Sequence, residues 1–147
     1  MVDNLSPEFR KEAMRAVKSS ATSLERTLFS MLIKAEVSGW RKGDPKVVGN
    51  PDVVFPKHKL AIFVDGCFWH GCAECRKPMP KSNSRYWKRK IAGNIKRAKF
   101  VSRELKSDRW RTIRVWEHEL KTIEDRALVI KKVKQHLKGG SKGAYQR

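Results

Sequence analysis

The chain has 147 residues, enough for one domain with a single hydrophobic core. It carries 34 lysines and arginines against 15 acidic residues, a formal charge of +19 at pH 7. Such an excess repels itself in a compact chain and predicts a polyanionic partner. Nucleic acid is favoured over a membrane surface, because no long apolar run or amphipathic anchor is present. The N-terminus lacks a signal-peptide pattern, and three clustered cysteines argue against a disulfide framework. Both features favour a reducing cytoplasm.

The first predicted element is a short helix over residues 6–17, with Ser6 as N-cap and Pro7 at the first helical position. It is too short and polar to be stable alone. Residues 1–20 are therefore either an arm that orders on DNA or a solvated N-terminus. A second helix should end near residue 36, with apolar residues at helical period. Thr22 and Glu25 have capping-box spacing, so Glu25 also has a purely structural explanation.

Three strands are predicted next: an edge strand over residues 37–42, a short strand over residues 53–55 and a buried strand over residues 59–64. The last is an almost continuous apolar run, which is typical of a strand covered on both faces. In a hairpin of this length, Asp52 and Val64 fall at the same end. The residues after Val64 therefore begin at the carboxyl end of a central strand, where catalytic groups gather in α/β sheets.

A long helix over residues 85–106 follows, apolar on one face and basic on the other, and then a strand over residues 112–116. The basic face is either solvated surface or a phosphate-contacting surface, and its scarcity of acids favours phosphate. Strand, helix and strand form a βαβ unit, so the two strands should be parallel. A helix over residues 124–137 completes an α/β domain with a mixed central sheet, residues 21–138. Residues 139–147 are predicted to be a flexible tail.

All three cysteines lie close together, as Cys67, Cys72 and Cys75. Soft ligands at this spacing favour a structural zinc ion over free buried thiols. The fourth ligand is either His70 or His118, and His118 lies just past the last predicted strand, at the same edge of the sheet. If His118 completes the site, His70 is left on a rigid loop, where a histidine suits the role of general base. A structural role explains His70 equally well.

Asp52 is the candidate ligand of a second metal. With a backbone carbonyl or a second acid it offers the oxygen ligands that Mg²⁺ prefers, and Mg²⁺ activates water and neutralises charge on a phosphodiester. Its Pro-Asp context is, however, also a common turn dipeptide. Phe68, Trp69 and Trp87 are either core residues or aromatics that insert between DNA base pairs, at an unstacking cost of about a few kcal/mol per step.

The sequence resembles the very short patch repair DNA mismatch endonucleases over roughly residues 5–125. The matching pieces are residues 14–17, 24–26, 49–55, 65–72 and 115–117, with Asn94 and Arg97. The most specific is Asp-Gly-Cys-Phe-Trp-His-Gly-Cys at residues 65–72, downstream of Pro-Asp. The resemblance implies a restriction-endonuclease-like fold with one structural zinc. It also implies a reaction that nicks one strand on the 5′ side of the thymine in a T:G mismatch.

The resemblance further implies roles for single residues. Asp52 resembles the central Mg²⁺ ligand, with the Val64 carbonyl beside it. His70 resembles the general base, and Glu25 an acidic partner of the metal. The zinc ligands implied are Cys67, Cys72, Cys75 and His118. The DNA contacts implied are the wedging aromatics Phe68, Trp69 and Trp87, the arm residues Met14 and Arg15, and Lys90, Asn94 and Arg97 on the basic helix.

Two positions depart from the family pattern. The usual Asn-x-x-Arg-Asp ends here in Ala98, and Asp65 stands where some relatives have histidine. Asp65 is therefore a candidate to replace the missing charge and to join the Mg²⁺ site. The prediction is a monomeric, zinc-stabilised, Mg²⁺-dependent nicking endonuclease that acts on mismatched double-stranded DNA. The alternatives are a restriction-type nuclease of the same fold and a non-catalytic zinc-containing DNA-binding protein, which Ala98 favours and Asp52 and His70 oppose.

Overall fold

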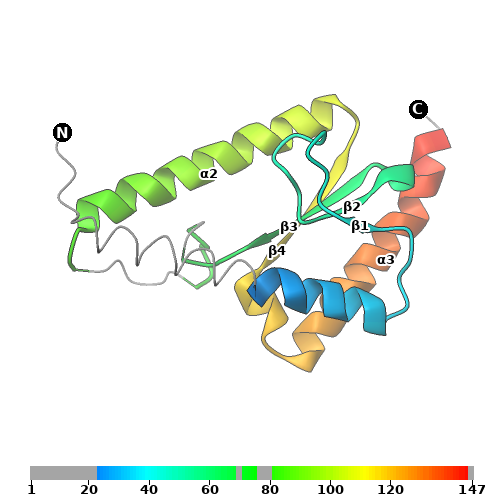
Figure 1. Ribbon diagram of the computed structural model, residues 1–147, viewed down its shortest axis with the longest axis horizontal. Coiled ribbons are helices and arrows are strands. Elements are labelled where there is room, and N and C mark those ends of the chain that lie inside the picture. The colour runs from blue at the N-terminus through cyan, green and yellow to red at the C-terminus, as the bar shows by residue number, and fades with distance from the viewer. Residues whose placement is uncertain (1–22, 69–70, 76–80, 146–147) are drawn as a thin grey trace.

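The computed structural model describes residues 23–68, 71–75 and 81–145. Its first helix covers residues 23–34 and is blue in Figure 1. The strands are β1 (Arg41–Lys42), β2 (Val53–Phe55), β3 (Leu60–Asp65) and β4 (Arg111–Trp116), and the other two α-helices are α2 (Ser84–Ser107) and α3 (Ile123–Tyr145). Two 3-10 turns, η1 (Pro56–His58) and η2 (Glu117–Leu120), follow β2 and β4.

The four strands form one mixed sheet in the order β1-β2-β3-β4. The pairs β1–β2 and β2–β3 are antiparallel, with Val53 opposite Ile62. The pair β3–β4 is parallel, with Ile62 opposite Ile113 and Asp65 opposite Trp116. The predicted mixed sheet and the predicted parallel pair are therefore confirmed. The parallel pair places the ends of β3 and β4 at one edge of the sheet.

Helices cover both faces of the sheet, as Figure 1 shows. Side chains alternate along each strand, so Val53, Phe55 and Ile62 pack with the helix over residues 23–34 and with α3, while Val54 and Phe63 pack against α2. Residues 60–62 of β3 are completely buried, which explains the unbroken apolar run in their sequence. None of the helices described is long and apolar enough to cross a bilayer.

The predicted edge strand is shorter than expected because a helix cap takes up its first residues. Glu36 adopts a left-handed conformation with φ of 55°, and the Val37 N–H donates to the Leu32 carbonyl at 3.0 Å. This is a Schellman motif, which ends the first helix and leaves only Arg41 and Lys42 in β1. The last helix, by contrast, runs beyond the predicted end at residue 137 to Tyr145. Glycines within a helix cost only about 1 kcal/mol each relative to alanine, which an established helix tolerates.

Two phenylalanines test where the core lies. Phe55 is completely buried, whereas Phe100 on α2 is 51% exposed. We expect Phe55→Ala to lower the free energy of unfolding by about 3–5 kcal/mol, through lost burial and an unfilled cavity. The same change at Phe100 should cost about 0.5 kcal/mol or less. Urea unfolding of the two variants measures the difference, and equal losses would contradict this placement of the core.

Candidate active site and metal centre

Three thiols and one imidazole converge at the edge where β3 and β4 end. The His118 Nδ1 atom lies 3.3 Å from the sulfur of Cys67, 3.7 Å from that of Cys72 and 3.4 Å from that of Cys75. All four donor atoms lie within 4.8 Å of one another. A tetrahedral zinc ion with bonds of about 2.3 Å to sulfur and about 2.0 Å to nitrogen needs a sulfur–nitrogen separation of about 3.5 Å. The donor set and its spacing therefore fit zinc.

The parallel pairing of β3 with β4 explains how ligands so distant in sequence meet. Cys67 follows β3 directly, and His118 lies in η2 directly after β4. The Cys67 N–H donates to Glu117 Oε1 at 3.1 Å, and the Cys72 N–H donates to the Cys67 carbonyl at 2.9 Å. The predicted group of Cys67, Cys72, Cys75 and His118 is thus brought together by the fold.

The surroundings of these ligands also suit a metal. The second ring nitrogen of His118 lies 3.1 Å from a carboxylate oxygen of Glu74, which leaves Nδ1 to face the sulfurs. A carboxylate behind a ligating histidine is the usual arrangement around zinc. Burial raises the pKa of the Cys67 thiol to about 12, so a bound cation is needed to hold this sulfur as a thiolate near neutral pH.

Gly71 packs the cysteine-bearing loop that follows β3 against α2. Its φ is 63°, and a Cβ at this position would lie 2.7 Å from Ile95 Cδ1. The left-handed backbone favours glycine at this position, and a larger residue would also require the end of the Ile95 side chain to shift. The loop is therefore tied to α2 as well as to the strand ends.

Asp52 lies at the start of β2, beside the end of β3. Its Oδ2 accepts the Val64 N–H at 2.7 Å, and its own N–H donates to the Ile62 carbonyl at 3.0 Å. In a strand the N–H and C=O of one residue point to the same neighbouring strand, so the Val64 carbonyl faces the Asp52 side. The predicted pairing of the Asp52 carboxylate with the Val64 backbone is consistent with this geometry.

Two further acids act on Asp52. The pKa of Asp52 is raised from 3.8 to about 7, first by burial, then by a side-chain hydrogen bond to Glu25, and further by the negative charges of Glu25 and Asp65. The Val64 N–H opposes this rise. Glu25, which has the spacing of a helix cap, thus reaches Asp52 from the helix over residues 23–34. Burial and these neighbouring acids therefore disfavour the charged form of Asp52, which a bound cation would favour.

Asp65 has a cationic partner that the sequence did not indicate. Asp65 is only 4% exposed, and Arg114 of β4 donates a hydrogen bond from Nη1 to its Oδ2. Arg114 reads in the sequence as an ordinary polar position in an alternating strand. Only the register of β3 against β4 brings it to Asp65.

The described aromatic residues predicted to contact DNA form a small cluster. The ring centroids of Phe68 and Trp87 lie 6.0 Å apart in an edge-to-face arrangement, and those of Trp87 and Tyr86 lie 4.8 Å apart. Trp87 is only 6% exposed. The buried Trp87 ring therefore packs edge-to-face against Phe68 and does not project into solvent.

The polar residues predicted to contact DNA lie along α2. Lys90, Asn94 and Arg97 follow one another at helical spacing, and Lys90 and Arg97 are exposed. Asn94 and Arg97 help to line a cavity of about 160 Å³ whose wall also includes Asp65. These residues therefore lead from the exposed basic surface of α2 towards the acidic site.

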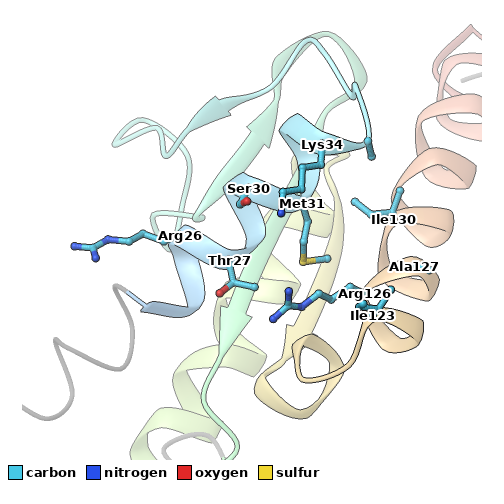
Figure 2. Close-up of a pocket in the computed structure, with 10 residues that line it drawn as sticks. Arg26, Thr27, Ser30, Met31, Lys34, Ile123, Arg126, Ala127 and Ile130 are labelled. Carbon is cyan, nitrogen blue, oxygen red and sulfur yellow. The ribbon is translucent and has the colours of Figure 1, made fainter.

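Four predicted residues lie outside the described part of the chain: Met14, Arg15, Trp69 and His70. A cavity of about 710 Å³ between the helix over residues 23–34 and α3 is lined by none of the predicted site residues (Figure 2). It is separate from the acidic site and from the thiols. The candidate site is therefore the sheet edge formed by the ends of β3 and β4.

The chain is similar to a known protein family along more than half of its length. The model of the family described as DNA mismatch endonuclease Vsr matches residues 2–77. The chain belongs to this family. It is 40% identical over 126 residues to the type II nicking enzyme V.XorIIP of Xanthomonas oryzae pv. oryzae, covering 84% of this chain and 90% of the relative.

Two other relatives give the same result. The type II nicking enzyme V.HpaIIP of Haemophilus parainfluenzae is 38% identical over 133 residues, or 89% of this chain and 94% of the relative. The DNA mismatch endonuclease Vsr of Escherichia coli K12 is 31% identical over 124 residues, or 84% of this chain and 79% of the relative. As a member of the Vsr family, this protein is an endodeoxyribonuclease, and its substrate is DNA.

The zinc assignment is tested by removing one ligand. We expect His118→Ala to lower the zinc content from about one ion per chain to well below one, because three thiols do not close a four-ligand site. His136→Ala on α3 is the matched control, since the ring of this histidine lies 3.0 Å from the Lys132 carbonyl of its own helix and away from the thiols. Elemental analysis of the purified proteins measures both. A full zinc complement in His118→Ala would contradict the assignment.

Proposed function

We propose that this protein is a Mg²⁺-dependent endonuclease that nicks one strand of double-stranded DNA on the 5′ side of the thymine in a T:G mismatch. The observation that carries the proposal is the meeting of Glu25, Asp52 and the Val64 backbone at the end of β3. The named activities of the relatives, mismatch endonuclease and nicking enzyme, support it. We further propose that it acts as a monomer in the cytoplasm, where a reducing medium keeps its thiols free for zinc.

We propose a restriction-endonuclease-like fold for the domain. Support comes from the β2–β3 hairpin, which presents a carboxylate at one end, and from the helices on both faces of a mixed sheet. In this arrangement the central strands carry the reacting groups, and zinc fixes the loop that follows β3. The N-terminal arm of residues 1–20, with Met14 and Arg15, would close on the DNA from outside this domain.

The residues of the acidic site take distinct roles in the proposal. Asp52 and the Val64 carbonyl would hold Mg²⁺, with Glu25 as their acidic neighbour. When bound, Mg²⁺ supplies charge neutralisation at the scissile phosphodiester and an activated water. His70, whose neighbours Cys67 and Cys72 are tied into the zinc site, would take a proton from the attacking water.

The DNA is proposed to lie against the cysteine-bearing loop that follows β3 and the first half of α2. Phe68, backed by Trp87, and Trp69 would wedge into the mismatched step, which distorts the duplex and exposes the thymine strand. Lys90 and Arg97, with Asn94 beside them, would contact phosphates. Such contacts give affinity without sequence preference, so discrimination of T:G would depend on the aromatic wedge.

A nicking assay on labelled duplexes tests the proposal. We expect nicking of a T:G duplex only with Mg²⁺, and its abolition in Asp52→Asn. His70→Ala should slow it by about 10²–10⁴-fold, which is the usual contribution of a general base. Asp108→Asn changes an exposed aspartate in the same way and should leave the rate intact. Equal nicking of matched DNA would replace the repair function by that of a restriction-type nuclease, and absence of Mg²⁺-dependent nicking on any duplex would reject both.

The raised pKa of Asp52 predicts a pH effect on stability. Between about pH 4 and about pH 7, the folded protein holds a proton on Asp52 that the unfolded chain has already released. The folded state then binds more protons, so this group loses stability as the pH rises through that window. We expect the free energy of unfolding of Asp52→Asn to rise relative to that of the native protein as the pH increases from about 5 to about 7. Above about pH 7 the difference between the two proteins should stay constant. Urea unfolding without Mg²⁺ measures this difference in the free energy of unfolding. A difference that does not change with pH would contradict the raised pKa of Asp52.

A further inference from the structure

We propose that Arg114 is a positioning residue of the nuclease site, which holds Asp65 in one orientation where Ala98 offers no polar partner. This inference rests on the proposed function, because it assigns Asp65 a place beside the Mg²⁺ site. It adds to the proposed site a residue of β4, the strand that leads to the zinc ligand His118.

The register of the parallel strands brings the two side chains together. Arg114 lies opposite Phe63, and Asp65 is two residues further along β3. Side chains two apart in a strand share a face, so all three point to the face covered by α2. The Arg114 guanidinium carbon lies 5.4 Å from the centre of the Phe63 ring, which fixes the guanidinium as it donates to Asp65.

Burial makes this ion pair consequential. The Asp65 side chain is 5% exposed and that of Arg114 is 24% exposed. A buried carboxylate must be paired or neutralised, whereas an exposed one is stabilised by water. Loss of Arg114 would therefore leave the buried Asp65 carboxylate without this cation, so the carboxylate would turn or draw in water.

α2 meets Asp65 at a shared cavity, whose lining includes Asn94, Arg97 and Ala98 of this helix. Ala98 lines the same cavity of about 160 Å³ as Asp65 and Arg114, and it contributes only a methyl group there. The cation on β4 thus acts across the cavity from Ala98.

Asp65 in turn acts on the proposed Mg²⁺ ligand. It follows Val64, whose N–H holds Asp52, and its negative charge is felt at Asp52. Arg114 has two separable effects on a metal bound there. The positive charge of Arg114 weakens Mg²⁺ binding by repulsion. Its hydrogen bond to Asp65 keeps a second carboxylate in place, which strengthens Mg²⁺ binding. The direction of change on removal of Arg114 therefore distinguishes positioning from simple neutralisation.

The test uses the full-length, zinc-loaded protein. Arg114→Leu, Arg114→Gln and Arg114→Lys are compared with Arg41→Leu, which breaks an exposed Arg–Asp pair of 2.8 Å on β1 and serves as the matched control. Mg²⁺ affinity is measured by calorimetry without DNA. The nicking rate is measured in single turnovers on saturating T:G duplex at saturating Mg²⁺, and thermal melting reports the folded fraction.

We expect Arg114→Leu to weaken Mg²⁺ binding and to slow nicking, each by roughly tenfold, the usual effect of losing a group that orients a metal site. Arg114→Lys should recover most of both losses, and Arg41→Leu should change neither. In the Asp65→Asn background, Arg114→Leu should add little, because Arg114 acts through Asp65. If Arg114→Leu does not fold, the contrast between the glutamine and lysine variants carries the same test.

Tighter Mg²⁺ binding by Arg114→Leu would overturn the positioning role, because it would show that Arg114 only neutralises charge. Unchanged binding and rate, or losses that simply multiply with those of Asp65→Asn, would overturn it as well. A native protein that neither binds Mg²⁺ nor nicks DNA would instead reject the proposed function. A native protein that does both, with unaffected Arg114 variants, would reject this inference alone.

Discussion

The parallel pairing of β3 with β4 is the constraint on which the rest of this structure depends. It ends both strands at one edge, so that Cys67 and His118, 51 positions apart in the sequence, come within 3.3 Å of each other. A metal bound there crosslinks the two strand ends and fixes the intervening loop. The same register places Arg114 beside Asp65. One pattern of backbone hydrogen bonds thus builds the thiol site and completes the acidic site.

The second constraint is electrostatic. The protein carries a formal charge of +19, yet the half-buried Glu25 and Asp52 and the buried Asp65 act on one another as neighbouring acids. This charge is unfavourable without a counterion, as the raised pKa of Asp52 reflects. Basic surface around an acidic centre is the arrangement expected where a divalent cation must meet a phosphodiester. In the proposed function, the surface would attract the polyanion and the acidic centre would hold the Mg²⁺.

Much of the fold could be predicted because its signals are local. The apolar run of β3, the period of α2 and the order of strand, helix and strand predicted the central elements and the parallel pair. The position of His118 after β4 made it one of two candidates for the fourth member of the thiol group, with His70 as the other, and the family resemblance implied His118. The boundaries that differ depend on backbone conformation at single residues, such as the left-handed Glu36 that shortens β1. Helix continuation through the glycines after residue 138 likewise has no compositional signal.

Other features of the site could not be predicted, because they depend on register and packing. Glu25 has the spacing of a helix cap, and only the tertiary fold shows that it reaches Asp52. The family resemblance implies that Trp87 contacts DNA, yet Trp87 is buried against Phe68, a consequence of the packing of α2 beside the loop that follows β3. Arg114 belongs to no motif. Its partner is set by which residue of β3 it faces, and that is a property of the sheet.

Mapping the nick at nucleotide resolution tests the central claim most directly. One duplex with a single T:G mismatch is labelled on either strand and incubated with the zinc-loaded protein and Mg²⁺. A single break on the 5′ side of the mismatched thymine, in that strand alone, is the predicted result. Breaks at the same position in the matched duplex, breaks in both strands, or an intact duplex would contradict the account.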